Sequence, residues 1–157
     1  YSADSIHFND SLRCYTLRKH RTVYGGGGIM PDVFVPLDTT QYTAFHRQLV
    51  ARSLVINTTL RYVEDHRDEL KTKYAKFDDY MKRFEVPQAM VDTLFAEAER
   101  QKVKPRDDAE RQRTLPMLRL QLKALIARDI WDMNEYFRLM NEQNHIVSKA
   151  VEVITGK

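Results

Sequence analysis

Four consecutive glycines, Gly25–Gly28, are the first candidate for chemistry in this sequence of 157 residues, which holds only one other glycine, Gly156. Glycine-rich loops bind phosphate when their backbone N–H groups surround the anion, a helix begins at the loop and a Gly-Lys-Ser/Thr sequence follows. Here the glycines continue into residues 29–32, whose Pro31 predicts an extended segment. The stretch is therefore interpreted as a turn or bulge that uses positive φ and close backbone approach, and no nucleotide site is predicted.

Side chains that commonly perform acid–base, nucleophilic or metal chemistry do not form a known pattern. The histidines make neither a His-Glu-x-x-His motif nor an i, i+4 pair, so each is interpreted as a surface histidine. No serine lies in a Gly-x-Ser-x-Gly elbow, and a single cysteine excludes a disulfide framework. The residues considered are His7, His20, His46, His66 and His145, the serines Ser2, Ser5, Ser11, Ser53 and Ser148, and Cys14.

Polar side chains also interrupt the apolar segment near the C-terminus. Arg128 and Asp132 are four residues apart, a spacing that allows an ion pair on a helix surface. Together with Asp129, Trp131 and Tyr136 they could line a groove, or they could form the polar edge of a buried helix. The second interpretation is preferred because helices of this kind are common. No catalytic, cofactor-binding or metal-binding residue is predicted.

The chain changes character near Asp38, and the part before this residue has the pattern of short β-strands. Strands are predicted at 11–17, 21–25 and 33–35, where β-branched and aromatic residues are bounded by turn residues. Residues 17–21 could form a hairpin tip. A β segment of this size is marginal alone in water, so we expect it to pair with strands outside this sequence or to pack on the helices.

After Asp38 the apolar residues recur at helical spacing. The longest such segment predicts a central helix over about 117–140, roughly 36 Å long, and the polar stretch 104–114 predicts a loop or a short exposed helix. The predicted fold is mainly α, with five to six helices around the long helix and a short β segment over about 12–35. Further helices are expected at 38–52, 54–70, 76–84, 86–103 and 142–156.

End signals accompany these helices. Asp38 or Thr39 is the predicted N-cap of the first helix and Ser53 that of the second, while Pro87 suits a first turn and Gly156 a C-cap. The predicted inward faces include Ile56, Leu60 and Val63 on the second helix and Ile146, Ala150, Val153 and Ile154 on the last.

Charge and composition limit the classes of partner that the chain is predicted to bind. The 25 lysines and arginines nearly balance the 22 aspartates and glutamates, and the net charge of +3 is spread over the helical part. Nucleic-acid surfaces gather basic residues on one face, so no nucleic-acid partner is predicted. No run approaches the about 18 apolar residues of a membrane span. The chain begins at Tyr1 without a signal-peptide pattern, which predicts a piece of a larger or processed protein.

The β segment carries a motif that can be followed residue by residue. Tyr15-Thr16, Arg21 and the sequence GGGGIMPD, residues 25–32, resemble the late catalytic-domain segment of the carboxyl-terminal processing peptidases, also called tail-specific proteases. That family has a Tyr-Thr strand, Gly-Arg, two spaced glycines, isoleucine, one variable residue and Pro-Asp. Gly26 and Gly28 match the paired glycines.

The match has three departures. His20 stands where the family usually has glycine, Leu17 stands where it often has proline, and the interval from Arg21 to Ile29 is one residue longer than in the commoner pattern. The helical remainder, especially residues 122–137, resembles the C-terminal region of the exported Bacteroidetes-type members.

The resemblance implies that the chain is the C-terminal part of a serine peptidase that cleaves proteins near their C-termini. Residues 1–37 would be the terminal β segment of the catalytic domain, and residues 38–157 a helical C-terminal domain. Family members use a serine nucleophile and a lysine base, whose pKa burial must lower, and a PDZ-like domain that captures substrates. These parts lie upstream of the motif, so no residue here inherits a catalytic role. Location in the periplasm or cell envelope is implied in the same way.

The helical part would then serve packing, substrate access or assembly. Its implied partners are the upstream catalytic and PDZ-like domains and the peptide substrates, and self-association stays open. The alternative is a free-standing helical protein-interaction module without protease activity.

Overall fold

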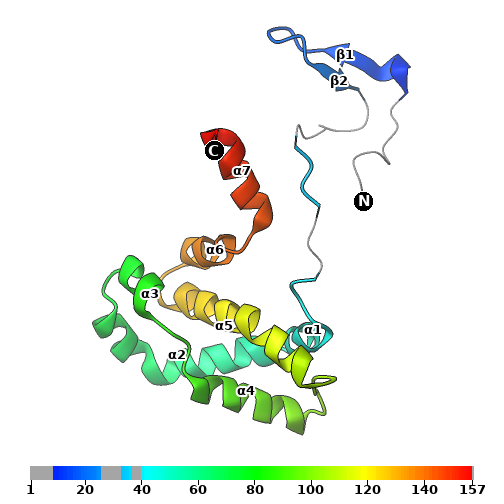
Figure 1. Cartoon of the computed structure of the whole chain (residues 1–157). Helices are drawn as coiled ribbons and strands as arrows, with labels where there is room; N and C mark the ends of the chain where they lie inside the picture. The colour runs from blue at the N-terminus through cyan, green and yellow to red at the C-terminus, as the bar shows by residue number, and fades with distance from the viewer. Residues whose placement is uncertain (1–8, 26–32, 37–39, 157) are drawn as a thin grey trace. The chain divides into compact units, whose positions relative to one another are not determined.

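The computed structural model describes residues 9–25, 33–36 and 40–156. The chain forms two compact units, Tyr1–Asp38 and Thr39–Lys157, and each is described by itself (Figure 1). The described residues are mainly helical with one short antiparallel sheet, which confirms the predicted fold class.

The first unit contains a β-hairpin that follows a 3₁₀ turn, η2 (Asp10–Leu12). β1 (Arg13–Tyr15) pairs antiparallel with β2 (Thr22–Tyr24), so that Cys14 lies opposite Val23. No described residue of this unit is buried. The hairpin therefore has no hydrophobic core of its own among these residues.

The hairpin loop includes the predicted tip. Arg21 N–H donates to Thr16 Oγ1 at 3.0 Å, and His20 has a φ of 45°, in the left-handed region. The third predicted strand, at 33–35, is wrong: these residues are not in a strand, because the sheet has two strands and offers them no partner there. Residues 26–32, with most of the glycine motif, lie outside the described residues.

The helical unit begins with α1 (Ala44–Ala51), whose N-cap is Thr43, with Oγ1 accepting from His46 N–H at 3.1 Å. The predicted caps, Asp38 and Thr39, lie outside the described residues. Ser53 does precede α2 (Leu54–Lys73), but it has a φ of 57° and its side chain makes no cap hydrogen bond.

The predicted inward face of α2 is confirmed at Val63 and wrong at Ile56 and Leu60, which are exposed. The other buried residues of this helix are Leu54, Val55, Thr59 and Leu70. The apolar side chains of this helix are spread around its circumference, so periodicity alone does not choose between the two faces. The helices that pack on α2, which are α1, α4 and α5, select the buried one.

α3 (Phe77–Arg83) and α4 (Gln88–Arg100) follow, with Pro87 at the N-cap position of α4. Tyr80, fully buried, stacks on Phe84 with ring centroids 4.6 Å apart. Its hydroxyl donates to Lys123 C=O on α5 at 2.8 Å. This hydrogen bond attaches α3 to the central helix.

α5 (Asp108–Ile130) is the central helix and packs against α1, α2 and α6 (Figure 1). Its apolar character around much of the circumference is confirmed, since the fully buried residues include Leu118, Leu122, Ala124, Ile126 and Ala127. Much of the predicted polar stretch 104–114 belongs to its first two turns, because Asp107 Oδ1 caps the helix by accepting from Glu110 N–H at 2.7 Å.

The predicted continuous helix over 117–140 is two helices. α5 ends at Ile130, and Asp132 caps α6 (Met133–Asn141), its Oδ1 accepting from Asn134 N–H at 2.6 Å. This break raises the helices of the described residues to seven. None of them is long and apolar enough to cross a membrane.

α7 (His145–Thr155) has no buried residue. The predicted inward face, which is Ile146, Ala150, Val153 and Ile154, is exposed instead, and Ile154 is 84% exposed. Gly156 ends the helix in the left-handed region with φ 68°, as predicted for a C-cap.

Candidate functional site

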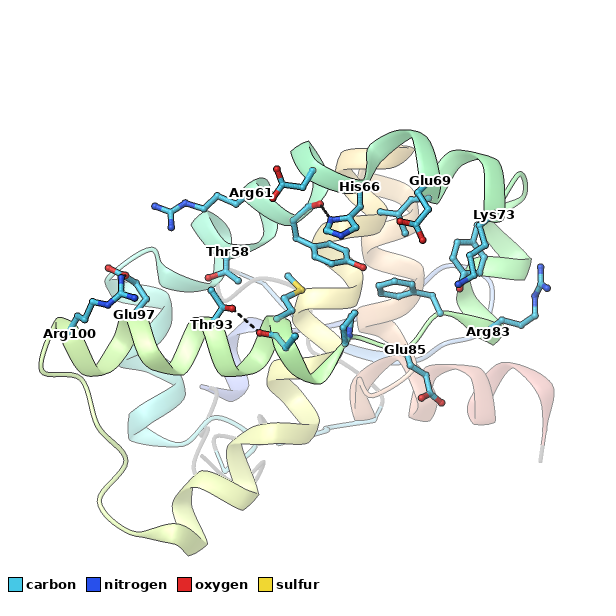
Figure 2. A pocket seen from close by; sticks show the side chains of 18 residues that line it. Thr58, Arg61, His66, Glu69, Lys73, Arg83, Glu85, Thr93, Glu97 and Arg100 are labelled. Atoms are coloured by element: carbon cyan, nitrogen blue, oxygen red, sulfur yellow. Dashed lines mark hydrogen bonds and ion pairs between the residues drawn. The ribbon is translucent and has the colours of Figure 1, made fainter.

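A large groove lies between α2 and α4 and is closed at one end by the segment that joins α3 to α4 (Figure 2). Its volume is about 830 Å³, within the range of roughly 300–1,000 Å³ for ligand sites. We call it the α2–α4 groove. Its walls are formed by α2 between Thr58 and Lys73, by α4 between Ala89 and Arg100, and by Tyr74, Arg83, Phe84, Glu85 and Pro87.

The two walls are fixed by the core beneath them. Val63 of α2 and Val91 and Leu94 of α4 are at most 1% exposed and belong to one apolar cluster. Arg119 of α5 donates to Val86 C=O at 2.8 Å and also bonds the Gln88 side chain, which holds the start of α4. The groove is therefore shaped by buried packing and by hydrogen bonds from the Arg119 side chain.

Its floor is apolar and aromatic. Leu70, Tyr74, Phe84 and Met90 line it and are each at most 5% exposed. The rings of Tyr74 and Phe84 meet edge to face, with centroids 5.9 Å apart. Because these side chains are already buried, they shape the floor and expose little apolar area to the groove.

Polar groups on α2 project over this floor. The rings of Tyr62 and His66 stack with centroids 4.3 Å apart, and His66 Nδ1–H donates to Tyr62 C=O at 2.9 Å. This bond directs Nε2 away from its own helix. Burial, followed by the nearby Glu69 carboxylate, raises the pKa of the Tyr62 hydroxyl, so this hydroxyl stays protonated and can donate.

The charged side chains of the wall differ in their partners. Arg100 binds Glu97 at 2.8 Å, Arg83 pairs with Asp79 at 3.6 Å, and Lys73 Nζ lies 5.5 Å from the centre of the Tyr74 ring. Arg61 points away from the floor, whereas Glu69 lies above it (Figure 2).

The histidine prediction is wrong at one position. His46 is 1% exposed, and its Nε2 lies 2.7 Å from Gln121 Oε1. Burial lowers its pKa, and its Nδ1 is buried without a hydrogen bond. The side chain is buried because α1 packs directly against α5, which helical periodicity does not reveal for a polar residue.

Glu110 is a buried carboxylate that the sequence analysis did not single out. Its Oε1 accepts from Phe45 N–H at 3.1 Å and its Oε2 from Arg106 N–H at 2.7 Å. These backbone hydrogen bonds lower the pKa of its carboxyl group. An Asp-x-x-Glu capping pattern at 107–110 could have indicated the start of α5 here.

The structure also places the predicted Arg128–Asp132 ion pair and the single cysteine. Arg128 pairs with the adjacent Asp129 at 2.8 Å, and the predicted pair with Asp132 does not form because α5 ends between them. Cys14 is free and exposed on β1.

Lys123 has one property of a lysine base, since burial lowers its pKa. Its ammonium group, however, donates to Met81 C=O at 2.7 Å and lies 5.9 Å from the centre of the Tyr80 ring. These contacts give it a structural role between α5 and α3. Within the described ranges, no group of three or more His, Cys, Asp or Glu side chains could hold a metal ion.

These features define a small helical domain with a groove between α2 and α4. Residues 45–132 match a family of unknown function, DUF8443. The match covers more than half of the chain, so the chain belongs to this family. It spans α1–α5 and both walls of the α2–α4 groove. Neither the curated proteins nor the solved structures gave a match.

Proposed function

We propose that this chain is the C-terminal part of a serine peptidase of the carboxyl-terminal processing type. In this proposal its helical unit is a non-catalytic part that serves protein interaction, substrate access or assembly. The nucleophile and the lysine base belong to the parent protein, upstream of Tyr1.

The observation that carries the proposal is the incomplete hairpin that bears the motif. β1 and β2 form a two-stranded sheet without a buried residue, and such a sheet is marginal alone. Leu12, Tyr15 and Val23 are exposed by 41–56%. Further strands would cover these exposed residues, and the catalytic domain of such a peptidase would supply them.

His20 adds local support. The peptidase family usually has glycine at this position, and here His20 has a φ of 45°. Glycine adopts this conformation without steric cost. The glycine preference of the peptidase family and the left-handed backbone of His20 are both consistent with the same turn.

A second candidate is a free-standing helical interaction module. It is favoured by the extent of the family match, which begins in α1 and does not include the hairpin. The helical unit would then act in proteins that have no protease domain.

The test is peptide hydrolysis by the complete gene product and by the chain 1–157. We expect the complete product to cleave an unstructured peptide, to lose this activity when its upstream motif serine is changed to alanine, and the chain 1–157 to show no turnover. A complete gene product without the serine and lysine motifs, or turnover by the purified chain alone, would overturn the peptidase proposal.

A further inference from the structure

We propose that the contact of α1 with α5 is sensitive to mild acid, so that α1 leaves α5 when the buried side chain of His46 takes up a second proton. Only the helical unit is involved, and the peptidase proposal is not required. The effect differs from a general loss of stability, because one helix opens while the remaining helices keep their core.

The docked state holds His46 as a neutral ring. The residue is 1% exposed, and its Nε2 lies 2.7 Å from Oε1 of Gln121 on α5. An amide oxygen only accepts, so Nε2 carries the hydrogen and Nδ1 holds a lone pair. Nδ1 is buried and, among the described residues, has no hydrogen-bond partner.

A second proton on His46 is unfavourable in this state. The imidazolium ring donates from both nitrogens, but an Nδ1–H group would face no acceptor at its buried position in the described structure. A buried donor without a partner and a buried charge both cost free energy. In the released state water accepts from both nitrogens, so protonation favours the release of α1.

The groups that pack around His46 do not compensate for this cost. Burial lowers its pKa, and the hydrogen bond with Gln121 raises it. The Tyr42 ring lies edge-on, with centroids 5.1 Å apart, and tyrosine stays neutral below about pH 10. Both oxygens of Glu110, a carboxylate of α5 at this interface, already accept from backbone N–H groups. The side chains that α2 buries are not titratable, and they are Leu54, Val55, Thr59, Val63 and Leu70.

α1 can open without the rest of the unit. Its buried residues are Phe45, His46 and Leu49, whereas α5 also packs against α2 and α6 in contacts that do not involve α1. A turn in which Ser53 has a φ of 57° separates α1 from α2. A helix of eight residues is marginal alone in water, so the released segment loses its helical hydrogen bonds and its amides can exchange.

Release of α1 changes the connection between the two units. α1 is the first helix of the unit that begins at Thr39, and the chain before it leads to the unit with the hairpin. The eight residues of α1 would add up to about 26 Å of extended chain to this connection. Mild acid would therefore lengthen the segment that joins the two units.

Native-state hydrogen exchange of the chain 1–157 tests this, with NMR detection at pH 7.5 and 5.5 in increasing urea. Correction for the intrinsic exchange rate at each pH converts the measured rates into opening constants. At pH 7.5 we expect residues 47–50 to exchange through a local opening, with a constant about tenfold or more above that of residues 118–127 and little dependence on urea. From pH 7.5 to 5.5 this constant should rise about three- to tenfold.

Two variants assign the pH response to His46. His46→Gln removes the titration and keeps an amide that can bond Gln121, so the opening constant of residues 47–50 should be the same at both pH values. His145→Gln, at an exposed histidine, is the control and should keep the wild-type rise. Circular dichroism verifies that each variant is folded. If His46→Gln does not fold, NMR titration of the His46 ring in the wild type decides, with the Nε2–H tautomer and a pKa below the ordinary value of about 6.5 expected.

Three results would overturn the inference. The first is exchange of residues 47–50 with the same opening constant and urea dependence as residues 118–127, because α1 would then open only with the whole unit. The second is a local opening that does not respond to pH, or that responds equally in His46→Gln. The third is a His46 ring that carries its hydrogen on Nδ1 or titrates at its ordinary pKa. None of these results bears on the peptidase proposal, since no turnover is measured.

Discussion

Glu110 connects two backbone segments through one carboxylate. It accepts from the N–H of Phe45 in the first turn of α1 and from the N–H of Arg106 before α5. A buried N–H without a partner costs about 1–3 kcal/mol. The carboxylate therefore holds α1 against the start of α5, and at Phe45 it satisfies a buried donor.

Replacement of Glu110 by glutamine should destabilise the helical unit. Both carboxylate oxygens accept, whereas glutamine offers one oxygen and one amino group, so one of the two backbone donors would lose its acceptor. We expect a loss of about 1–3 kcal/mol in the free energy of unfolding, measured by urea denaturation at pH 7. The control is Asp108→Asn, at an exposed carboxylate in the same turn. It should change the free energy of unfolding by only a few tenths of a kcal/mol.

Backbone hydrogen bonds lower the pKa of Glu110 in the folded chain. Its contribution to the free energy of unfolding is therefore fully present above the ordinary carboxyl pKa. It is lost as the pH falls through the lowered value. The difference between wild type and Glu110→Gln should therefore shrink below about pH 4. An unchanged difference at pH 3 would contradict this assignment.

His46 predicts a second pH dependence, at milder acidity. Burial lowers its pKa in the folded chain, so between that value and the ordinary value of about 6.5 the unfolded chain binds more protons. The free energy of unfolding should therefore rise with pH below about 6.5 and level off above it. Urea denaturation at several pH values measures this slope, and His46→Leu should reduce it. The slope should persist in the control His145→Gln, at an exposed histidine.

Helix boundaries show what sequence patterns can predict at the scale of elements. The left-handed Gly156 and the existence of α3 and α4 follow directly from their local signals. The break at Asp132 does not, because Met133–Asn141 continues the same apolar periodicity, although the backbone leaves the helical region at Trp131 and Asp132. The buried face of α2 likewise depends on which helices contact it, and this information is not local.

The α2–α4 groove is hidden from the sequence for the same reason. Residues 64–73 have a dense mixture of charges that indicates a solvated face, and Asp65 and Glu69 are indeed exposed. What the pattern cannot show is that α4 lies beside this face and makes it one wall of a groove.

α7 contributes little to the core of the helical unit, since none of its residues is buried. We expect truncation after Asn144 to change the free energy of unfolding by less than about 0.5 kcal/mol, in the range of surface changes. Leu122→Ala, at a fully buried position of α5, should cost about 2–5 kcal/mol. Urea denaturation of both variants provides the comparison, and a loss of several kcal/mol on truncation would show that α7 packs on the core.

The whole chain combines a unit with an extensive core and a unit without one among its described residues. Composition and periodicity predict this contrast, since the apolar periodic segments begin after Asp38. The buried apolar cluster indeed consists of residues from α1–α6 and their connections. Pairing of the hairpin with further strands is not predicted by local patterns, because strand pairing depends on residues that are distant along a chain.

Hydrogen exchange should separate the two units. An exposed two-stranded hairpin opens at a free-energy cost near zero, whereas buried helices open only at a cost near the free energy of global unfolding. In the chain 1–157 we therefore expect the amides of β1 and β2 to exchange almost unprotected and those of Leu118–Ala127 in α5 to exchange slowly. The peptidase proposal predicts that, in the complete gene product, strand pairing by a catalytic domain makes the hairpin amides slow and leaves α5 unchanged. Slow hairpin exchange already in the chain 1–157 would show that these strands need no further partner, and fast exchange in both proteins would show that no such pairing exists.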